Sequence, residues 1–337
     1  MVDKSIYSRW LNDASRQLAA ADIPTARLDA ELILAHALGV DRTWVIAHGD
    51  ETFPTRPAVS TPKDLASRFA SAGDVSTRLS EGFTFPAKRG KTSDQLAPSE
   101  SAESLVETIA GPQYYADHLL RQRLQHIPLA YLLDHKEFYG RTFAVTPDVL
   151  IPRPETETLI DIARELTLPD APTVCDVGTG SGCIAITLAL ELPQSVLYAT
   201  DISPAALDIA RHSATAFSAN VTFVHSNLLD AFHNPAKIQN LQSKIRFDLI
   251  VANLPYVDPS WQRSPETDHE PSLALFAENN GLALISQLIA QAPACLTKNG
   301  RLLLEADPEQ HDTIVRQARR HGFRELQRRD YVVALGP

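Results

Sequence analysis

The chain has 337 residues, of which 44% are hydrophobic, and a formal net charge of −10. At this length we expect about two domains, and the mean hydropathy of −0.14 is ordinary for a globular protein in water. The acidic balance argues against strong, sequence-independent binding to nucleic acid phosphates. The amino terminus shows no signal-peptide core and no apolar run approaches a membrane span, so the cytoplasm is the expected location. Cysteines are too few and too poorly spaced for a disulfide framework or a zinc site, and we expect packed thiols at Cys175, Cys183 and Cys295.

The beginning of the chain predicts a small helical unit. Apolar residues recur at helical spacing between Leu28 and Leu38. Thr25 is a candidate N-cap before this stripe, and Gly39 is a candidate stop signal after it. We expect the N-terminal helical domain to comprise residues 1–50 and 113–127.

The two parts of this helical domain are separated by a segment of different composition. Residues 51–112 are rich in Ser, Thr, Pro, Ala and charged residues, with few large apolar side chains. This composition predicts a disordered insertion, with a transient helix near residues 104–109. A linker without a role in chemistry is the simplest interpretation of the segment.

The rest of the chain divides into a hairpin with a linker, 128–157, and a catalytic domain, 158–337. The hairpin is expected to turn at Gly140-Arg141. After it, apolar strands alternate with helical segments, which predicts an α/β fold with a parallel, doubly wound sheet and antiparallel strands at its end. Strands are expected at 173–177, 196–200, 221–225, 247–252, 300–305, 323–326 and 331–335, and helices at 182–191, 204–216, 280–296 and 308–321.

A glycine-rich turn follows the first of these strands. Gly178, Gly180 and Gly182 lack side chains where a cofactor must come close. The G-x-G-x-G spacing differs from the dinucleotide fingerprint, which disfavours NAD, and the turn has no P-loop lysine. Asp201 ends the next strand about 20 residues on, where a carboxylate can accept both ribose hydroxyls. The alternative is that Asp201 only places a negative charge at the start of the next helix. Asn227 follows the third strand and is expected near the adenine. The predicted cofactor-binding residues are Asp176, Gly178, Thr179, Gly180, Ser181, Gly182, Asp201, Asn227, Leu228 and Asn253.

The tetrapeptide Asn253-Leu254-Pro255-Tyr256 directly follows the buried-strand pattern 247–252. The Asn side-chain oxygen and the next backbone carbonyl can each accept one N–H of a planar –NH2 group, and Tyr can stack on its plane. Together with the glycine turn, this pattern predicts a methyltransferase that acts on a planar amino group with S-adenosylmethionine as donor. The predicted catalytic residues are Asn253, Leu254, Pro255 and Tyr256.

With these motifs and the segment 151–157, Ile-Pro-Arg-Pro-Glu-Thr-Glu, the chain resembles the release-factor glutamine N5-methyltransferases of the HemK/PrmC family. The resemblance extends through Pro128 to Tyr131, Glu137 to Gly140 and Glu270-Pro271, and it leaves out little besides 51–112. It implies a class I S-adenosylmethionine-dependent methyltransferase, a Rossmann-like doubly wound sheet with a small N-terminal helical domain.

The family transfers methyl from S-adenosylmethionine to the glutamine amide of the Gly-Gly-Gln motif in class 1 peptide release factors, in support of translation termination. By this resemblance the helical domain recognises the protein substrate, although packing that merely stabilises the hairpin is the alternative. Arg153 and Glu155 are expected to shape the glutamine pocket, with a linker-pinning salt bridge as their alternative role. The substrate-binding residues implied are Arg153, Glu155, Asn253, Leu254, Pro255 and Tyr256.

The chain departs from the family pattern in four places. Leu254 stands where Pro is usual, although its backbone carbonyl remains and Pro255 still favours extended geometry before it. Asp134 replaces a common Gly, Asn227 replaces a common acidic residue, and Ala277-Glu278 interrupts a glycine-rich stretch.

Other functions share parts of this pattern. Adenine N6 presents the same planar –NH2, so a nucleic acid amino-group methyltransferase is the nearest alternative, disfavoured by the acidic charge. A binding module that keeps the cofactor fold without turnover is a second alternative, and a dehydrogenase is a distant one. We therefore expect a class 1 release factor as partner, with no membrane and no stable nucleic acid binding.

Overall fold

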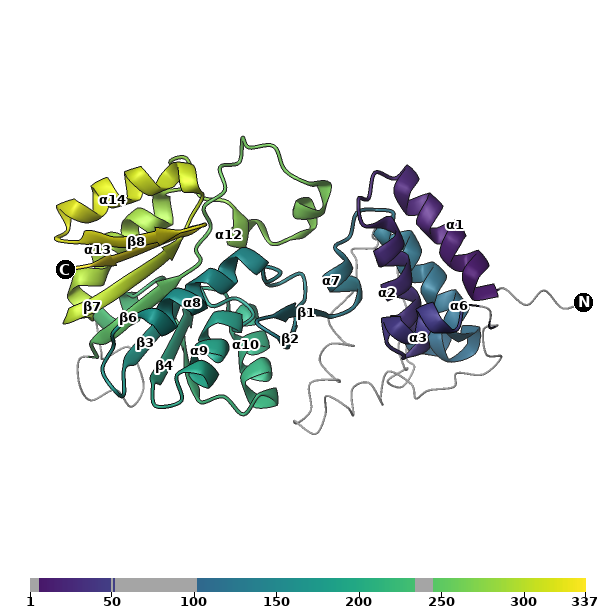
Figure 1. Ribbon diagram of the computed structural model, residues 1–337, viewed down its shortest axis with the longest axis horizontal. Helices are drawn as coiled ribbons and strands as arrows, with labels where there is room; N and C mark the ends of the chain where they lie inside the picture. The colour runs from purple at the N-terminus through teal and green to yellow at the C-terminus, as the bar shows by residue number, and fades with distance from the viewer. Residues whose placement is uncertain (1–5, 50, 52–101, 234–244) are drawn as a thin grey trace, which may run out of the picture. The chain divides into compact units, whose positions relative to one another are not determined.

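The computed structural model of the protein forms two compact units, Met1–Leu133 and Asp134–Pro337 (Figure 1). The first unit has one hydrophobic core of its own, and the second has two, one on each face of its sheet. The residues that the structure describes are 6–49, 51, 102–233 and 245–337.

The first unit is built from helices. Its elements are α1 (Ile6–Ala20), α2 (Ala26–Leu38), α3 (Arg42–Ala47), α6 (Ala102–Arg123) and the single turn α7 (Leu129–Leu132). Helix α2 packs against α1, α3 and α6, and Leu18, Ile33 and Leu34 are fully buried among them. As predicted, Gly39 ends α2 in the left-handed conformation that favours glycine. Thr25 precedes α2 but its side chain makes no capping hydrogen bond.

A buried ion pair joins α2 to α6. Arg123 Nε donates to Asp29 Oδ2 at 2.7 Å, and both side chains are almost completely buried. The same guanidinium also donates to the Ile127 carbonyl, four residues further along the chain, and so fixes the segment directly after α6. Removing one partner of such a pair leaves an uncompensated buried charge.

The predicted insertion 51–112 lies largely outside the described residues, which exclude 52–101. Its last part, 102–112, belongs to α6, which begins at Ala102 and includes the helix expected near residues 104–109. Gly111, with φ 74° and ψ 170°, interrupts the helix just before Pro112. Proline has no backbone N–H for a helical hydrogen bond, so Pro112 favours an interruption of the helix at this point.

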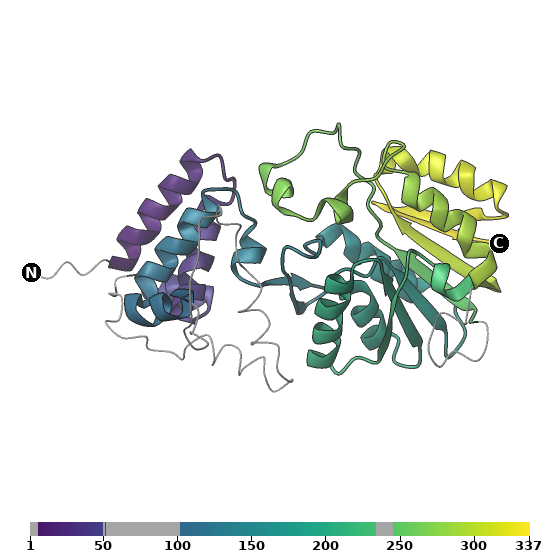
Figure 2. The ribbon, with the colours of Figure 1, turned by 180° about the vertical axis from the view of Figure 1, so that it is seen from behind.

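The second unit contains a seven-stranded sheet with the strand order β5-β4-β3-β6-β7-β9-β8 (Figures 1 and 2). The first five strands in that order are parallel, and β9 joins β7 and β8 in antiparallel pairing, as predicted. The strands are β3 (Thr173–Val177), β4 (Val196–Asp201), β5 (Val221–His225), β6 (Phe247–Ala252), β7 (Leu296–Glu305), β8 (Arg324–Arg329) and β9 (Val332–Gly336).

Helices cover both faces of this sheet (Figure 2). Alternate strand residues face opposite layers, since Val174 packs with one group of helices and Cys175 with the other. The first group is α8 (Glu157–Glu165), α9 (Cys183–Glu191) and α10 (Pro204–Ala216). The other is α11 (Asp230–His233), α13 (Ala283–Cys295) and α14 (His311–Arg320). From β3 the sheet grows through β4 to β5 on one side and through β6 to β7 on the other. The order therefore reverses between β3 and β6, and open α/β sheets bind ligands at such a point.

The predicted hairpin is present, but its turn lies one residue earlier than expected. Strands β1 (His135–Phe138) and β2 (Arg141–Ala144) pair with Phe138 opposite Arg141, so Tyr139-Gly140 forms the turn. Both turn residues have positive φ, 52° and 69°, as a two-residue primed turn requires. Tyr139 is held there by its backbone N–H donating to Glu157 and its hydroxyl donating to Asp161.

All three cysteines are buried thiols that form no disulfide, as expected of packed thiols. Among the residues described, no cluster of His, Cys, Asp and Glu could hold a metal ion. No helix within those same ranges is both long and apolar enough to cross a membrane.

Candidate active site

The glycine turn connects β3 to α9 at the carboxyl edge of the sheet. Its glycines all have positive φ, but they serve different purposes. A Cβ on Gly178 would meet Leu254 Cδ2 at 2.9 Å, and one on Gly182 would meet Ile186 and Ala210. Only at Gly180 would a Cβ meet nothing within 4 Å. Packing therefore explains Gly178 and Gly182, and Gly180 leaves open space above the turn.

Asp176 lies beneath this turn and is completely buried. Its Oδ2 accepts hydrogen bonds from the Thr179 hydroxyl at 2.7 Å and the Ala185 backbone N–H at 3.1 Å. Its Oδ1 is buried without a hydrogen-bond partner in the described part of the chain. Burial raises the pKa of this carboxyl to about 7, against the lowering effect of these two bonds. The free oxygen is a strong acceptor that a cationic ligand group would satisfy.

Asp201 ends β4 and faces the same turn. Its Oδ2 accepts from the Gly180 N–H and its Oδ1 from the Ser203 N–H, each at 2.9 Å. A carboxylate oxygen has two lone pairs, so both oxygens retain an acceptor for ribose hydroxyls. The side chain therefore does more than place a charge at the start of α10, because it also fixes the glycine turn.

At the end of β5, Asn227 is exposed and Leu228 is buried with φ 49°. The chain is held here by Ser226, whose N–H donates to the Asp201 carbonyl, and by Leu229, whose N–H donates to Gln291. The predicted cofactor residues thus lie at the ends of β3, β4 and β5, except Asn253, which follows the neighbouring strand β6.

The tetrapeptide 253–256 follows β6 and lines a cavity of about 260 Å³. Other walls come from Arg153, Trp261, Arg263 and Glu305. Such a cavity suits one side chain better than a whole ligand of drug size, for which pockets start at roughly 300 Å³. The structure therefore brings all four predicted catalytic residues to a single cavity at the end of β6.

The Asn253 amide is oriented by Thr156. Asn253 Nδ2 donates to Thr156 Oγ1 at 3.1 Å. Because the amide nitrogen is engaged in this way, the side-chain oxygen is the end left to accept from a substrate.

The backbone at Tyr256 is fixed by Gln310. Gln310 Nε2 donates to the carbonyls of Tyr256 at 2.9 Å and Asn280 at 2.7 Å, and its Oε1 accepts from the Asp307 N–H. A Cβ on Gly281 would lie 1.9 Å from the Tyr256 carbonyl oxygen, so only glycine fits beside this segment. The tetrapeptide is therefore held in place by Gln310 and Gly281, neither of which lines the cavity.

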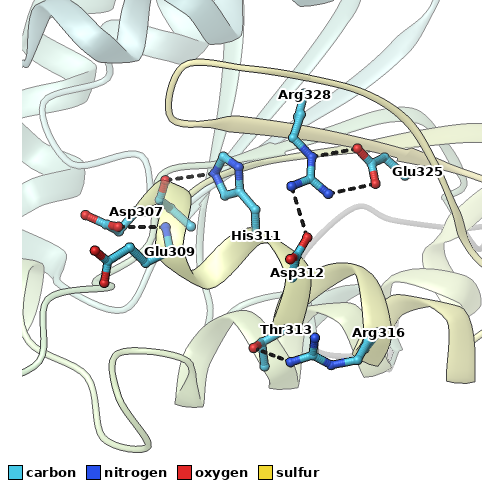
Figure 3. Close-up of polar contacts among 9 residues, drawn as sticks. Asp307, Glu309, His311, Asp312, Thr313, Arg316, Glu325 and Arg328 are labelled. Carbon is cyan, nitrogen blue, oxygen red and sulfur yellow. Dashed lines mark hydrogen bonds and ion pairs between the residues drawn. The ribbon is translucent and has the colours of Figure 1, made fainter.

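Gln310 lies in the short 3-10 helix η4 (Pro308–Gln310). Figure 3 shows the contacts of Asp307, Glu309 and His311 that hold this helix. Asp307 Oδ1 accepts from the Glu309 N–H at 2.9 Å, and Asp307 forms a capping box with Gln310. His311 hydrogen-bonds the Ala306 carbonyl at 3.1 Å. These contacts fix the chain directly after β7, where Glu305 points to the cavity wall.

Glu305 is a buried carboxyl at the carboxyl end of β7. Its Oε1 accepts from the Tyr256 hydroxyl at 3.4 Å. Burial raises the pKa of Glu305 to about 7, and the Thr156 and Tyr256 hydroxyls oppose that shift. Burial also raises the pKa of Tyr256, with Glu305 as the next cause.

Arg153 lies on the cavity wall and forms an ion pair with Glu270. Glu270 is buried and also accepts from the Ile151 N–H at 3.2 Å. The pair joins the segment 151–157 to the loop before α12 (Ser272–Leu275) within the second unit. Arg153 thus lines the cavity and forms an ion pair within the second unit, and its part in binding the glutamine stays a prediction. Glu155 is exposed and absent from the residues that line the cavity.

Four contributing residues were not predicted: Thr156, Gly281, Glu305 and Gln310. Glu305 had a recognisable sequence signal, since it directly follows the apolar run Leu302-Leu303-Leu304. A carboxylate is rarely found in such a buried position unless it has a partner or a function. Thr156 stood inside a recognised motif without an assigned role. The contacts of Gln310 and Gly281 depend on the tertiary structure and have no local signal.

Sequence comparisons agree with this arrangement. A family model described as the PrmC N-terminal domain matches residues 9–70, and one described as a methyltransferase domain matches residues 169–321. A release factor glutamine methyltransferase from Deinococcus radiodurans is 31% identical over 317 residues, 93% of this chain and 90% of the relative. One from Koribacter versatilis is 34% identical, over 88% of this chain and 86% of the relative.

Solved structures with a related fold are more distant. The ribosomal protein L11 methylase from Lactobacillus delbrueckii subsp. bulgaricus is 23% identical, with a TM-score of 0.40, over 55% of this chain and 78% of its own. The 16S rRNA N2 G1207 methyltransferase of T. thermophilus, in complex with AdoMet and guanosine, is 19% identical with a TM-score of 0.43, over 60% and 48%.

The sheet order, the glycine turn and the matched methyltransferase domain define a class I S-adenosylmethionine-dependent methyltransferase. The open space at Gly180, the free acceptor of Asp176 and the carboxylate of Asp201 fit this cofactor, which carries a positive charge and a ribose. With its relatives aligned over most of their length, the chain belongs to the family of release factor glutamine methyltransferases.

Proposed function

We propose that this protein transfers a methyl group from S-adenosylmethionine to the side-chain amide nitrogen of the glutamine in the Gly-Gly-Gln motif of class 1 peptide release factors. Family membership supports this activity. The structural observation that carries it is the hydrogen bond from Asn253 to Thr156, which leaves an amide oxygen as acceptor on a one-side-chain cavity.

The chain's own residues align the substrate. Asn253 Oδ1 and the Leu254 carbonyl accept the two N–H groups of the glutamine amide, which orients its nitrogen and stabilises the positive charge that develops on it. The ring of Tyr256 covers the amide plane, and Pro255 keeps the segment extended. Arg153 shapes the cavity through its ion pair, whereas Glu155 acts at a distance from it.

The cofactor is held by the ends of β3, β4 and β5. Asp201 takes the ribose hydroxyls, Asp176 faces the charged methionine part, and Gly180 permits close approach above the turn. Thr179, Ser181 and Gly182 shape the turn, and Asn227 with Leu228 forms the adenine end. When bound, S-adenosylmethionine supplies a methyl group that its sulfonium charge has already activated, so these residues need only bind and orient.

The N-terminal helical unit, residues 1–50 and 113–127, recognises the release factor. A cavity that accepts one side chain cannot by itself distinguish one protein from another, so selectivity requires a second surface. The hairpin and linker, 128–157, connect this unit to the catalytic domain, 158–337. We place the reaction in the cytoplasm, where release factors act.

The nucleic acid alternative is tested by competition between substrates. Purified protein with methyl-labelled S-adenosylmethionine should label an intact class 1 release factor, and a factor with its motif glutamine changed to glutamate should take up no label. Adenine-containing DNA and RNA should likewise remain unlabelled. Labelled nucleic acid together with an unlabelled release factor would contradict the proposed function.

A further inference from the structure

Gln310 is a buried glutamine whose side-chain amide contacts three separate segments of the second unit. It is the last residue of η4, and only 6% of it is exposed. Its Nε2 donates to the carbonyl of Tyr256 at 2.9 Å and to that of Asn280 at 2.7 Å, while its Oε1 accepts from the Asp307 N–H at 3.1 Å. Backbone carbonyls only accept and a backbone N–H only donates, so these partners fix the orientation of the amide.

The capping box at the start of η4 accounts for only one of these contacts. Asp307 is the N-cap, and its N–H donates to the side chain at the third helical position, where both Glu and Gln are suitable. A glutamate at this position could accept that N–H, but an ionised carboxylate could not donate to the two carbonyls. The contacts with Tyr256 and Asn280 are therefore the ones that require the amide of Gln310.

The turn that supplies the Asn280 carbonyl has an unfavourable backbone conformation. Asn279, Asn280 and Gly281 have φ angles of 58°, 55° and 78°, all in the left-handed region. Two consecutive non-glycine residues in this region are costly, and such a conformation persists only where the surrounding structure holds it. The Gln310 amide joins this turn to the Tyr256 carbonyl, and the missing side chain of Gly281 leaves room for that carbonyl.

The backbone of Tyr256 is restrained on both sides of the carbonyl that Gln310 holds. The preceding Pro255 has a restricted φ angle. Two backbone hydrogen bonds, of 3.1 and 3.2 Å, join the following residue, Val257, to the segment 275–277. Gln310 thus completes a continuous set of contacts that runs from the tetrapeptide into the next loop.

We infer that Gln310 is a positioning residue for methyl transfer, which holds the Tyr256 backbone so that the Tyr256 ring and the Leu254 carbonyl meet the glutamine amide. Pro255 extends the restraint to Leu254, because its ring limits rotation between the two residues. Gln310 does not line the cavity, so it acts through the tetrapeptide and not on the substrate itself. This inference rests on the proposed glutamine-methylating function.

The test compares full-length wild-type protein with Gln310→Glu on a class 1 release factor at about pH 8.5, well above the usual pKa of a carboxyl. The variant keeps an acceptor for the Asp307 N–H and loses both donors. Its kcat should fall by roughly 10–100-fold, because a small displacement of the groups that align a reaction is costly. KM for the release factor and the calorimetric affinity for S-adenosylmethionine should each stay within about threefold, since the binding surfaces are unchanged.

A double-variant cycle shows whether Gln310 acts through the Tyr256 ring. Gln310→Met keeps a side chain of similar length that donates no hydrogen bond, and its kcat should fall as in Gln310→Glu. Tyr256→Ala removes the ring and keeps the carbonyl. In the Tyr256→Ala background, Gln310→Met should lower kcat much less than it does in the wild-type background, because residues that act as a unit are not additive.

Gln317→Glu is the matched control. Gln317 lies on α14, and its Oε1 accepts from the Ser286 hydroxyl of α13 at 2.8 Å, a contact that a glutamate can keep. The substitution introduces the same charge into the same unit, and Gln317 does not line the cavity. It should leave kcat, KM and the affinity for S-adenosylmethionine unchanged.

The outcomes separate this inference from the proposed function. A wild-type protein that transfers no methyl group to the release factor would overturn both. An active wild-type protein whose kcat is unchanged in Gln310→Glu would overturn the inference alone and leave Gln310 as a capping residue. An equal loss of kcat and of affinity for S-adenosylmethionine would also overturn it, as would the same loss of kcat in Gln317→Glu. Should Gln310→Glu fail to fold, the cycle with Gln310→Met decides, and additive losses there would overturn the inference.

Discussion

The side-chain nitrogen of Asn253 donates to the hydroxyl of Thr156 across 3.1 Å, although the two residues are 97 positions apart in the chain. Thr156 lies in the segment 151–157 before α8, and Asn253 follows β6. This contact joins the two most distinctive motifs of the sequence into one site. It also decides which end of the amide is available to a substrate.

Asn253→Ala should lower kcat of methyl transfer by about 10²–10³-fold, as expected for the loss of one oriented acceptor at the reacting group. The affinity for S-adenosylmethionine should change far less, because the glycine turn, Asp176 and Asp201 remain. Single-turnover kinetics and calorimetric binding on the same preparation measure the two effects. An equal loss in both would mean that Asn253 serves the cofactor and not the glutamine.

Leu254→Pro should keep or raise activity. The substitution retains the backbone carbonyl, restricts the φ angle of residue 254 and favours extended geometry at Asn253. The Leu254 side chain is buried against Gly178, so a modest fall in melting temperature is expected from lost packing. A large loss of kcat in a folded variant would show that the Leu254 carbonyl does not accept from the substrate as proposed.

Gly281→Ala should abolish activity or folding of the second unit, because the new Cβ would lie 1.9 Å from the Tyr256 carbonyl oxygen. Gly322→Ala is the matched control, since Gly322 also has positive φ, 87°, but a Cβ there meets nothing within 4 Å. Both variants carry the strain of a left-handed alanine, about 1 kcal/mol. Melting temperature and kcat should fall much further in Gly281→Ala, and similar values for the two variants would contradict the clamp on Tyr256.

The stability of the cofactor-free protein should depend on Glu305 in a defined direction. Its pKa is about 7 in the folded protein against an ordinary 4.5, so the folded state binds the proton more tightly. The contribution of proton binding at Glu305 to the free energy of unfolding is therefore greatest at low pH, and it is lost as the pH rises through about 7. Relative to wild type, Glu305→Gln should gain on the order of 1–3 kcal/mol between about pH 5 and 8.

Urea unfolding at both pH values measures this difference. Taking the difference between variant and wild type cancels the titration of other groups, including Asp176, whose pKa is raised in the same way. A difference that stays constant with pH would show that Glu305 is ionised throughout the range.

Arg123→Ala should destabilise the first unit by about 3–5 kcal/mol, because it leaves the Asp29 carboxylate buried without its partner. Replacing both residues with leucine should recover much of that loss, since the desolvation cost of both charges disappears. Thermal unfolding of the full chain measures both effects. A double variant no more stable than Arg123→Ala would show that the two side chains are needed to pack α2 against α6, and not only to neutralise each other's charge.

The sequence predicts the centre of the sheet well because β3 and β6 are buried on both faces and therefore appear as short apolar runs. The bounds of β3, β5 and β6 agree with the expected ranges. The hairpin turn was misplaced by one residue because the positive φ of Tyr139 depends on contacts with Glu157 and Asp161, which no local pattern reveals.

The site was predicted only in part for the same physical reason. The glycine turn and the tetrapeptide each lie in one short stretch of sequence, so spacing and residue type are enough to identify them. The residues that orient them are distant in sequence, as Gln310 is 54 positions from Tyr256 and Glu305 is 49. Their role depends on which strands become neighbours, and that follows from the whole fold.

The most direct test of the central claim is to locate the methyl group. A class 1 release factor treated with the protein and S-adenosylmethionine is digested, and the peptide that contains the Gly-Gly-Gln motif is fragmented in a mass spectrometer. We predict one added methyl on the side chain of that glutamine with wild-type protein, and none with Asn253→Ala. A methyl group on another residue, or an unmodified motif peptide despite measurable cofactor binding, would contradict the account.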